Sequence, residues 1–376
     1  NFTADGGTIK LDGNYPVGTN NVALGDTALA ALTSGSRNVA VGTNAADALT
    51  TGVRNVAIGF DALTTAVDDD QNTAVGAYAL NTTEADNNSG LGYLALYANT
   101  TGASNVAVGS SALQNNTTAS NNTAVGYVAG YSTTTGALNT FVGREAAYSN
   151  TTGQHNVAIG QSANYANTTG NYNVSLGSQA LRFNTTSSDN VAVGYQTLYS
   201  MSSTGDANKS TAVGYQAGYN STHNVDAFGS QALYSNTTGV LSVAIGREAL
   251  YSNTTANYNT AVGYQAGYSN TTGSENSYFG RFSGKGVTTG TGNVFLGARA
   301  GNYQIPTTTG SYNTVIGSYS KVGNAGDSHA VAFGHNIVGT SGFTTLGDAS
   351  ADIRAAHGNV TWNTVSDQRY KKDIVD

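Results

Sequence analysis

The sequence predicts an all-β fold, namely a parallel β-solenoid or β-roll of about 20 rungs that assembles as a homotrimeric rod. Three observations predict this fold. One five-residue motif recurs at a spacing of 17 residues along most of the chain. Charged residues make up only 10% of the 376 residues, against about 25% in typical soluble proteins, which leaves few of the residues that cover helix faces. An apolar content of 39%, with 23 tyrosines and only 2 prolines, is also unlike a disordered chain.

The recurring motif is Asn-Val-Ala-Val-Gly, with small variations, and we call its final residue the register glycine. Most successive register glycines lie 17 residues apart, and the other spacings are 16, 20, 15 and 13. Positions are numbered below from this glycine, so that −1 precedes it and +1 follows it. The register glycines are Gly25, Gly42, Gly59, Gly76, Gly92, Gly109, Gly126, Gly143, Gly160, Gly177, Gly194, Gly214, Gly229, Gly246, Gly263, Gly280, Gly297, Gly317, Gly334 and Gly347.

The three residues before each register glycine are predicted to form a short strand. Position −1 is bulky and apolar, as in Ile58, position −2 is usually Ala, as in Ala57, and position −3 is β-branched, as in Val56. Such alternation is typical of a strand with one face in the core. We expect the −1 and −3 side chains in the core, and the −2 alanines packed at close range against another surface.

The remainder of each repeat is predicted to be a second short strand between two turns. Ala returns at +3 and a large residue often follows at +4, as in Ala62 and Leu63. Turn sequences such as Asn-Thr-Thr-Gly at 150–153 then close the repeat, since Asn and Gly tolerate positive φ. Seventeen residues are too few for a βα unit but suit one rung of a solenoid. At about 4.8 Å per rung, 20 rungs would form a rod about 95 Å long.

A roll this thin is expected to need partner chains. About 17 residues per turn enclose a small core, so one chain alone would be marginally stable. The flat alanine columns could pack against copies of the same chain, and cyclic symmetry is the common arrangement for identical chains. We therefore expect a parallel homotrimer.

The charge and composition exclude several classes of function. The net charge of −7 argues against a nucleic-acid partner. The chain has no cysteine, which excludes disulfides and thiolate metal sites, and no apolar run long enough for membrane insertion. We expect no cofactor, and a polar surface rich in Asn, Thr and Gly that suits a virion or extracellular protein.

The repeated Asn-Val-Ala-Ile-Gly, at 55–59 and 156–160, resembles the head repeats of trimeric autotransporter adhesins. The resemblance covers about residues 21–347 and implies a left-handed parallel β-roll with three chains per head. The period of 17 is longer than in those heads, so the handedness is left open.

The C-terminal sequence 366–374, Ser-Asp-Gln-Arg-Tyr-Lys-Lys-Asp-Ile, resembles the start of the endosialidase-type intramolecular chaperone. That domain ends many bacteriophage tail fibres and tailspikes, assists trimerisation and then cuts itself away. The resemblance implies that Ser366 is the nucleophile of this self-cleavage and that Lys371 is its base. A serine hydroxyl needs such a base because it is a weak nucleophile. We expect residues 366–376 to be the truncated start of this domain.

Two sets of polar residues are candidates for metal sites. Asp68, Asp69 and Asp70 could hold Ca²⁺, although a solvated loop insertion is the simpler interpretation. The histidines lack metal-ligand spacing and are expected at the surface or in loops. They are His155, His223, His329, His335 and His357.

Glu145, Glu248 and Glu275 are the candidates for glycosidase acids. Glycosidases need two carboxylates at a defined separation, and the sequence contains no clustered or repeated pair. Arg144-Glu145 and Arg247-Glu248 are more simply interpreted as surface ion pairs. We therefore expect no hydrolase activity from the repeats, and at most self-cleavage at Ser366.

A column of tyrosines, mostly at +5, is predicted to form a stripe along the solenoid. The stripe could be a platform for sugar rings, because Tyr offers an apolar face and a polar tip, or an aromatic ladder that seals the wall between rungs. The Asn-Thr-Thr triplets are formal glycosylation sequons, but turn geometry explains their placement. The stripe comprises Tyr131, Tyr148, Tyr165, Tyr199, Tyr219, Tyr234, Tyr251 and Tyr268.

These observations predict a lead-in (1–20), a repeat region (21–347), a neck or cap containing Trp362 (348–365) and the chaperone start (366–376). The predicted function is a structural and receptor-binding segment of a bacteriophage tail fibre, located in the virion. Its partners would be two further copies, other tail proteins and a glycan or protein receptor on the host. The alternatives are the head of a bacterial surface adhesin and a glycan-degrading tailspike.

Overall fold

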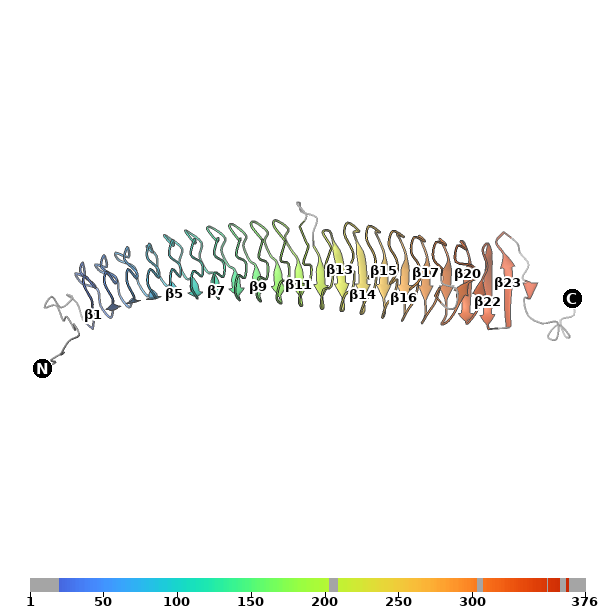
Figure 1. Cartoon of the computed structure of the whole chain (residues 1–376), viewed down its shortest axis with the longest axis horizontal. Coiled ribbons are helices and arrows are strands. Elements are labelled where there is room, and N and C mark those ends of the chain that lie inside the picture. Colours follow the sequence, from blue (N-terminus) through green and yellow to red (C-terminus); the bar gives the residue numbers. More distant parts are fainter. Residues whose placement is uncertain (1–19, 203–208, 303–306, 350, 359–362, 365–376) are drawn as a thin grey trace. The chain divides into compact units, whose positions relative to one another are not determined.

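The computed structural model describes residues 20–202, 209–302, 307–349, 351–358 and 363–364. These residues contain strands and turns and no helix. These described residues divide into two compact units, unit 1 up to residue 190 and unit 2 from residue 191 onward. In each unit the chain winds in successive coils, with one strand of the parallel sheet on the same side of each coil (Figure 1). The predicted parallel β-solenoid is therefore confirmed.

Unit 1 contains a parallel sheet of short strands, one per coil. Neighbouring strands pair without any shift of register, so that Val39 lies opposite Val56 and Ala40 lies opposite Ala57. Identical positions of successive repeats are thus stacked on one another. The strands are β1 (Val22–Leu24), β2 (Val39–Val41), β3 (Val56–Ile58), β4 (Thr73–Val75), β5 (Ser89–Leu91), β6 (Val106–Val108), β7 (Thr123–Val125), β8 (Thr140–Val142), β9 (Val157–Ile159) and β10 (Val174–Leu176).

Unit 2 repeats this arrangement in a second set of parallel strands. They are β11 (Val191–Val193), β12 (Thr211–Val213), β13 (Val225–Phe228), β14 (Ser242–Ile245), β15 (Thr260–Val262), β16 (Ser277–Phe279), β17 (Val294–Leu296), β18 (Thr314–Ile316), β20 (Val331–His335) and β22 (Phe343–Asp348).

The C-terminal end of unit 2 departs from the parallel pattern. Strand β23 (Ala351–Ala356) pairs antiparallel with β22, and β24 (Asn363–Thr364) pairs antiparallel with β23. These two strands fall in the segment for which a neck was predicted. Trp362 lies outside the described residues.

The prediction of which strand face is buried was wrong. From Ala40 onward the −2 alanines point into the coil and are fully buried, whereas Ile159 and Ile245 at −1 expose 39% and 42% of their surface. In a typical coil the core consists of the Ala at −2, the Ala at +3 and a large residue at +4. Ala57, Ala62 and Leu63 form such a core and are all fully buried.

The narrow interior of the coil explains this choice. Where Phe141 replaces Ala at −2, Gly130 replaces Leu at +4 of the preceding coil, and a Cβ on Gly130 would collide with the Phe141 ring. The interior therefore holds one large side chain in that place and no more. Leu is the commonest residue at +4, and beside it only Ala fits at −2, so the larger −1 and −3 side chains point outward.

The second short strand was also expected wrongly in most coils. Residues at +2 and +4 adopt positive φ, as in Asp61 (52°) and Leu63 (56°), and this conformation makes turns rather than strands. Among the residues that the structure describes, only the last coils form a second, two-stranded sheet, between β19 (Lys321–Val322) and β21 (Val338–Gly339). The register glycines have a positive φ too, and a Cβ on Gly42 would meet the carbonyl of Gly59 in the next coil, so only glycine fits there.

The asparagines at −4 form a buried ladder that joins successive coils. Asn122 accepts a hydrogen bond at Oδ1 from the backbone N–H of Asn139 (2.9 Å), and its Nδ2 donates to the carbonyl of Gly136 (2.9 Å). The side chain thus satisfies backbone groups of the next coil that have no water to bind. Stacked amide ladders of this kind stabilise in-register sheets.

Candidate functional site

The outward face of the sheet is apolar in both units. Every −1 residue of the strands in unit 1 is Val, Leu or Ile, and every −1 residue in unit 2 is Val, Ile, Leu or Phe. Many of them expose more than a third of their surface, including Phe279 and Leu296. The −3 column beside it is mostly Val and Thr, and its single charged residue is Asp226. Continuous exposed apolar columns are typical of an interaction surface.

The predicted tyrosine stripe consists of stacked rings. In unit 1, the centroids of Tyr131, Tyr148 and Tyr165 lie 5.2 and 5.3 Å apart, with nearly parallel planes. In unit 2, the centroid separations between neighbouring rings are 4.9–5.2 Å, for Tyr199, Tyr219, Tyr234, Tyr251 and Tyr268.

The stacks leave little ring face for a ligand. Each inner ring has a neighbour on both faces, and a cation covers one end of each stack: Arg182 lies over Tyr165 (5.4 Å) and Lys285 over Tyr268 (5.6 Å). Burial, and secondarily the neighbouring phenols, raises the pKa of Tyr148 and of Tyr219. The geometry is that of an aromatic ladder, and sugar binding by this stripe stays a prediction.

The structure brings three cations together around one aromatic ring, which the sequence analysis missed. Arg281, Lys285 and Arg299 lie 5.0, 4.8 and 5.5 Å from the ring centroid of Phe282. Arg281 is exposed, and Lys285 and Arg299 are half-buried. Arg281 and Lys285 occupy +1 and +5 of one coil, and Arg299 occupies +2 of the next coil. A comparison of residues in stacked repeats could have predicted this cluster, whereas a search for neighbours along the chain could not.

The aspartates at 68–70 do not behave as one site. Asp69 is 9% exposed and accepts a hydrogen bond from the Val67 N–H, whereas Asp68 is exposed. Burial raises the pKa of Asp69 to about 6, with a further contribution from the Asp68 and Asp86 carboxylates. The solvated insertion was therefore a wrong interpretation for Asp69. No group of three or more His, Asp or Glu that could hold a metal occurs in the described part of the chain.

The histidines lie in separate places. His155 stacks on Tyr172 with a centroid separation of 4.9 Å. His335 Nδ1 lies 3.1 Å from a carboxylate oxygen of Asp348. The His335 ring also packs edge-on against Tyr319. The two histidines have different partners and share no site.

The glutamates considered as glycosidase acids are placed apart as well. Arg144–Glu145 and Arg247–Glu248 form the predicted ion pairs, at 2.7 and 3.3 Å, with both arginines well exposed. Glu248 also accepts a hydrogen bond from Gln265 in the next coil. Glu275 lies before its strand at −5, whereas the other two follow theirs at +2.

The asparagines of most Asn-Thr-Thr triplets are buried and hydrogen-bonded. Asn167 and Asn253 are fully buried, and their Nδ2 atoms donate to Asn150 Oδ1 (2.9 Å) and Asn236 Oδ1 (2.8 Å) of the preceding coils. These asparagines lie at +7 and form a second ladder, separate from the one at −4. A glycan on such a nitrogen would have to break the hydrogen bonds of this second ladder, so turn geometry and the ladder account for these triplets.

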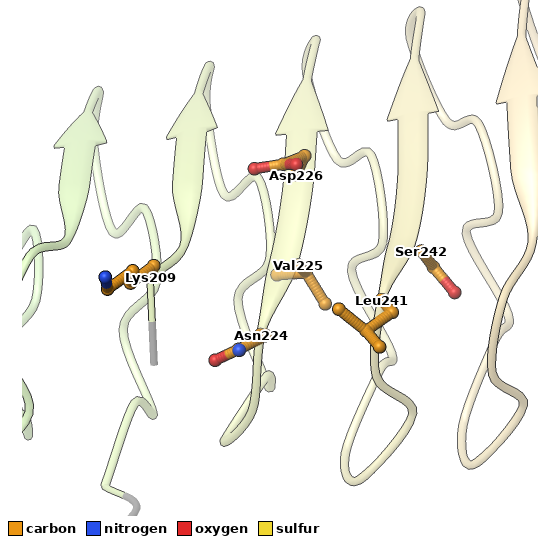
Figure 2. Close-up of a pocket in the computed structure, with 6 residues that line it drawn as sticks. All are labelled: Lys209, Asn224, Val225, Asp226, Leu241 and Ser242. Atoms are coloured by element: carbon orange, nitrogen blue, oxygen red, sulfur yellow. The ribbon is translucent and has the colours of Figure 1, made fainter. Parts of the chain in front are cut away.

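A shallow pocket of about 190 Å³ lies in unit 2, where Ser210, Val225 and Ser242 interrupt the asparagine ladder. Figure 2 shows its lining, in which the Lys209 side chain points away from Asp226. Val225 is 2% exposed and occupies the place of the missing amide. The pocket therefore has no converging pair of groups suited to acid–base chemistry. It is lined by Lys209, Asn224, Val225, Asp226, Leu241 and Ser242.

Ser366 and Lys371, the residues predicted for self-cleavage, lie outside the described residues. Within the described ranges there is no helix long and apolar enough to span a membrane. Comparisons with protein-family models, with curated proteins and with solved structures found no match.

Proposed function

We propose that this chain is a structural and receptor-binding segment of a bacteriophage tail fibre that attaches the virion to its host. The observation that supports the proposal best is the exposed apolar −1 column, which runs along the sheet of each unit. In water such a surface is unfavourable, because about 25 cal/mol is gained for each Å² of apolar area that is buried. Three copies packed through these columns would bury it.

The number three comes from the resemblance to trimeric adhesin heads and to the trimerising chaperone at 366–374. The in-register coils supply a regular support, with about 4.8 Å between neighbouring strands. Three chains would present three equivalent receptor sites, and several weak contacts to one cell surface then combine into strong attachment.

The assembly is tested by light scattering of the purified native chain. A mass three times the 38.2 kDa of one chain is expected. A monomeric mass at micromolar concentration would contradict the trimer.

The attachment is tested with the fluorescently labelled full chain. Binding to cells of a bacterial host, and competition with adsorption of phage, are expected. Binding to matrix-coated surfaces or animal cells, with none to bacteria, would favour the adhesin head instead. Release of reducing sugar from bacterial polysaccharide would favour the glycan-degrading tailspike.

A further inference from the structure

We propose that Arg281, Lys285 and Arg299 form a binding site for an acidic polysaccharide, an inference that rests on the proposed attachment function and names its ligand class. The site lies on unit 2, beside the C-terminal ends of β16 and β17.

The first argument is the shared ring. All three cations lie within 6 Å of the Phe282 centroid, a distance at which the ring quadrupole attracts a positive charge. Arg299 also lies 5.8 Å from the Tyr319 centroid, and the Tyr264 centroid is 5.2 Å from that of Phe282. The aromatic rings therefore hold the charged groups in place without neutralising them.

The second argument is the absence of a carboxylate partner. Arg144 and Arg247 each pair with the glutamate that follows them, but in the described residues no ion pair is formed by Arg281, Lys285 or Arg299. Each charge lies 4.8–5.5 Å from one ring centroid, so any two of them are at most about 11 Å apart. That separation is comparable with the screening length of about 8 Å, so the charges repel one another. A chain of net charge −7 has thus gathered three unneutralised cations in one place, and a bound anion would relieve their repulsion.

The third argument concerns the kind of anion. Arg281 and Lys285 belong to one coil and Arg299 to the next, so the charges follow the stacking direction, in which coils repeat about every 4.8 Å. A polymer with an anionic group on successive units can meet all three, whereas a single small anion meets fewer. The flanking tyrosines add apolar faces and hydroxyls, which suit sugar rings. Carboxylate and phosphate groups can both bind to these cations, so the experiment below includes one polymer of each kind.

The chain itself shows which substitutions the coil tolerates. Gln occurs at +1 in Gln161, at +2 in Gln265 and at +5 in Gln114. The triple variant Arg281→Gln, Lys285→Gln, Arg299→Gln therefore uses residues already found in each column. A matched control is Arg37→Gln, Arg54→Gln, Arg144→Gln in unit 1, which removes the same charge from exposed positions.

The experiment measures binding of the full chain to immobilised polysialic acid (carboxylate), phosphomannan (phosphate), neutral dextran and single-stranded DNA. Wild-type protein and the control are expected to bind one or both acidic polysaccharides, and dextran not at all. The triple variant is expected to bind at least about tenfold more weakly, since it loses three charged hydrogen-bond donors together with their attraction for the anions. Raising the salt from 50 to 500 mM should weaken wild-type binding more than that of the triple variant.

Several outcomes would overturn the proposal: equal binding by the triple variant, an equal loss in the control, or binding to DNA as tight as to either polysaccharide. A triple variant whose mass differs from that of wild type would instead assign the cations to contacts between chains. The purified polymers test the cation site separately from attachment to cells. If wild-type protein binds host cells but none of the acidic polymers, the cation site is refuted and the attachment function is not. Failure to bind both cells and polymers would refute the attachment function as well.

Discussion

The ring of Tyr278 occupies the space that a side chain on Gly284 would need. Tyr278 lies at −2, where most coils have Ala, and Gly284 lies at +4 of the same coil, where Leu is the commonest residue. Gly267, at +4 of the preceding coil, faces the same ring. The −2 and +4 side chains thus fill one shared volume, so a larger residue in one column requires a smaller residue in the other.

We expect Gly284→Ala to lower the free energy of unfolding by about 2–4 kcal/mol, through overpacking against Tyr278 and strain at a φ of 58°. Urea denaturation followed by circular dichroism measures the effect. The matched control is Gly342→Ala, which has a φ of 76° and no atom within 4 Å of its Cβ, and should cost only about 1 kcal/mol. Equal costs would show that the Tyr278 ring does not limit this position.

The hydroxyl of Tyr278 is buried without a hydrogen-bond partner, and burial holds its pKa well above the usual range. Tyr278→Phe should therefore raise the free energy of unfolding by about 1 kcal/mol, because it removes an unsatisfied polar atom and keeps the ring. The same denaturation assay on Tyr251→Phe, whose ring is only half-buried, should show almost no change. Destabilisation by Tyr278→Phe would mean that the hydroxyl is bonded after all.

Asn122→Ala is expected to destabilise the protein by about 2–5 kcal/mol. The change leaves the backbone N–H of Asn139 and the carbonyl of Gly136 buried without partners, and each such group costs about 1–3 kcal/mol. Hydrogen exchange should show faster exchange of the Asn139 amide. Asn115→Ala is the control, since Asn115 is half-buried and outside the ladder, and a loss as large there would argue against the ladder.

The raised pKa of Asp69 predicts a pH dependence of stability. The folded protein holds this proton up to about pH 6 and the unfolded chain releases it near 3.8, so the folded state binds more protons between these values. Stability should therefore fall as the pH rises from 4 to 6, by at most about 3 kcal/mol, and then level off. Urea denaturation at several pH values measures the slope.

The variant Asp69→Asn should remove this part of the slope and stabilise the protein at pH 7. Asp68→Asn, at an exposed neighbouring position, should leave most of it. An unchanged slope in Asp69→Asn would assign the pH dependence to other groups.

The proposed assembly makes the outward columns sensitive to charge. Ile159→Lys and Ile245→Lys place an ammonium on the −1 columns, and each should shift the mass towards one chain while circular dichroism stays unchanged. Thr152→Lys, at an exposed turn, should leave the mass unaltered. A variant Ile159→Lys with wild-type mass would place the contact between chains elsewhere.

The sequence by itself determined the coil period and the position of the strand before each register glycine. It could do so because glycine is required at one position of the repeat. At Gly42 and Gly59 the backbone has a positive φ and approaches the next coil so closely that no other residue fits. The same requirement recurs in every repeat. The stacked tyrosines followed from the same register, since equal positions of successive coils must lie over one another.

Only the tertiary structure decided which face of each strand is inside. Alternation at Val56, Ala57 and Ile58 shows that two faces differ, but the buried one depends on the volume left by Leu63 across the coil. It also decided that Arg281, Lys285 and Arg299 meet at Phe282, because their distance in space depends on how adjacent coils pack and not on their separation along the chain.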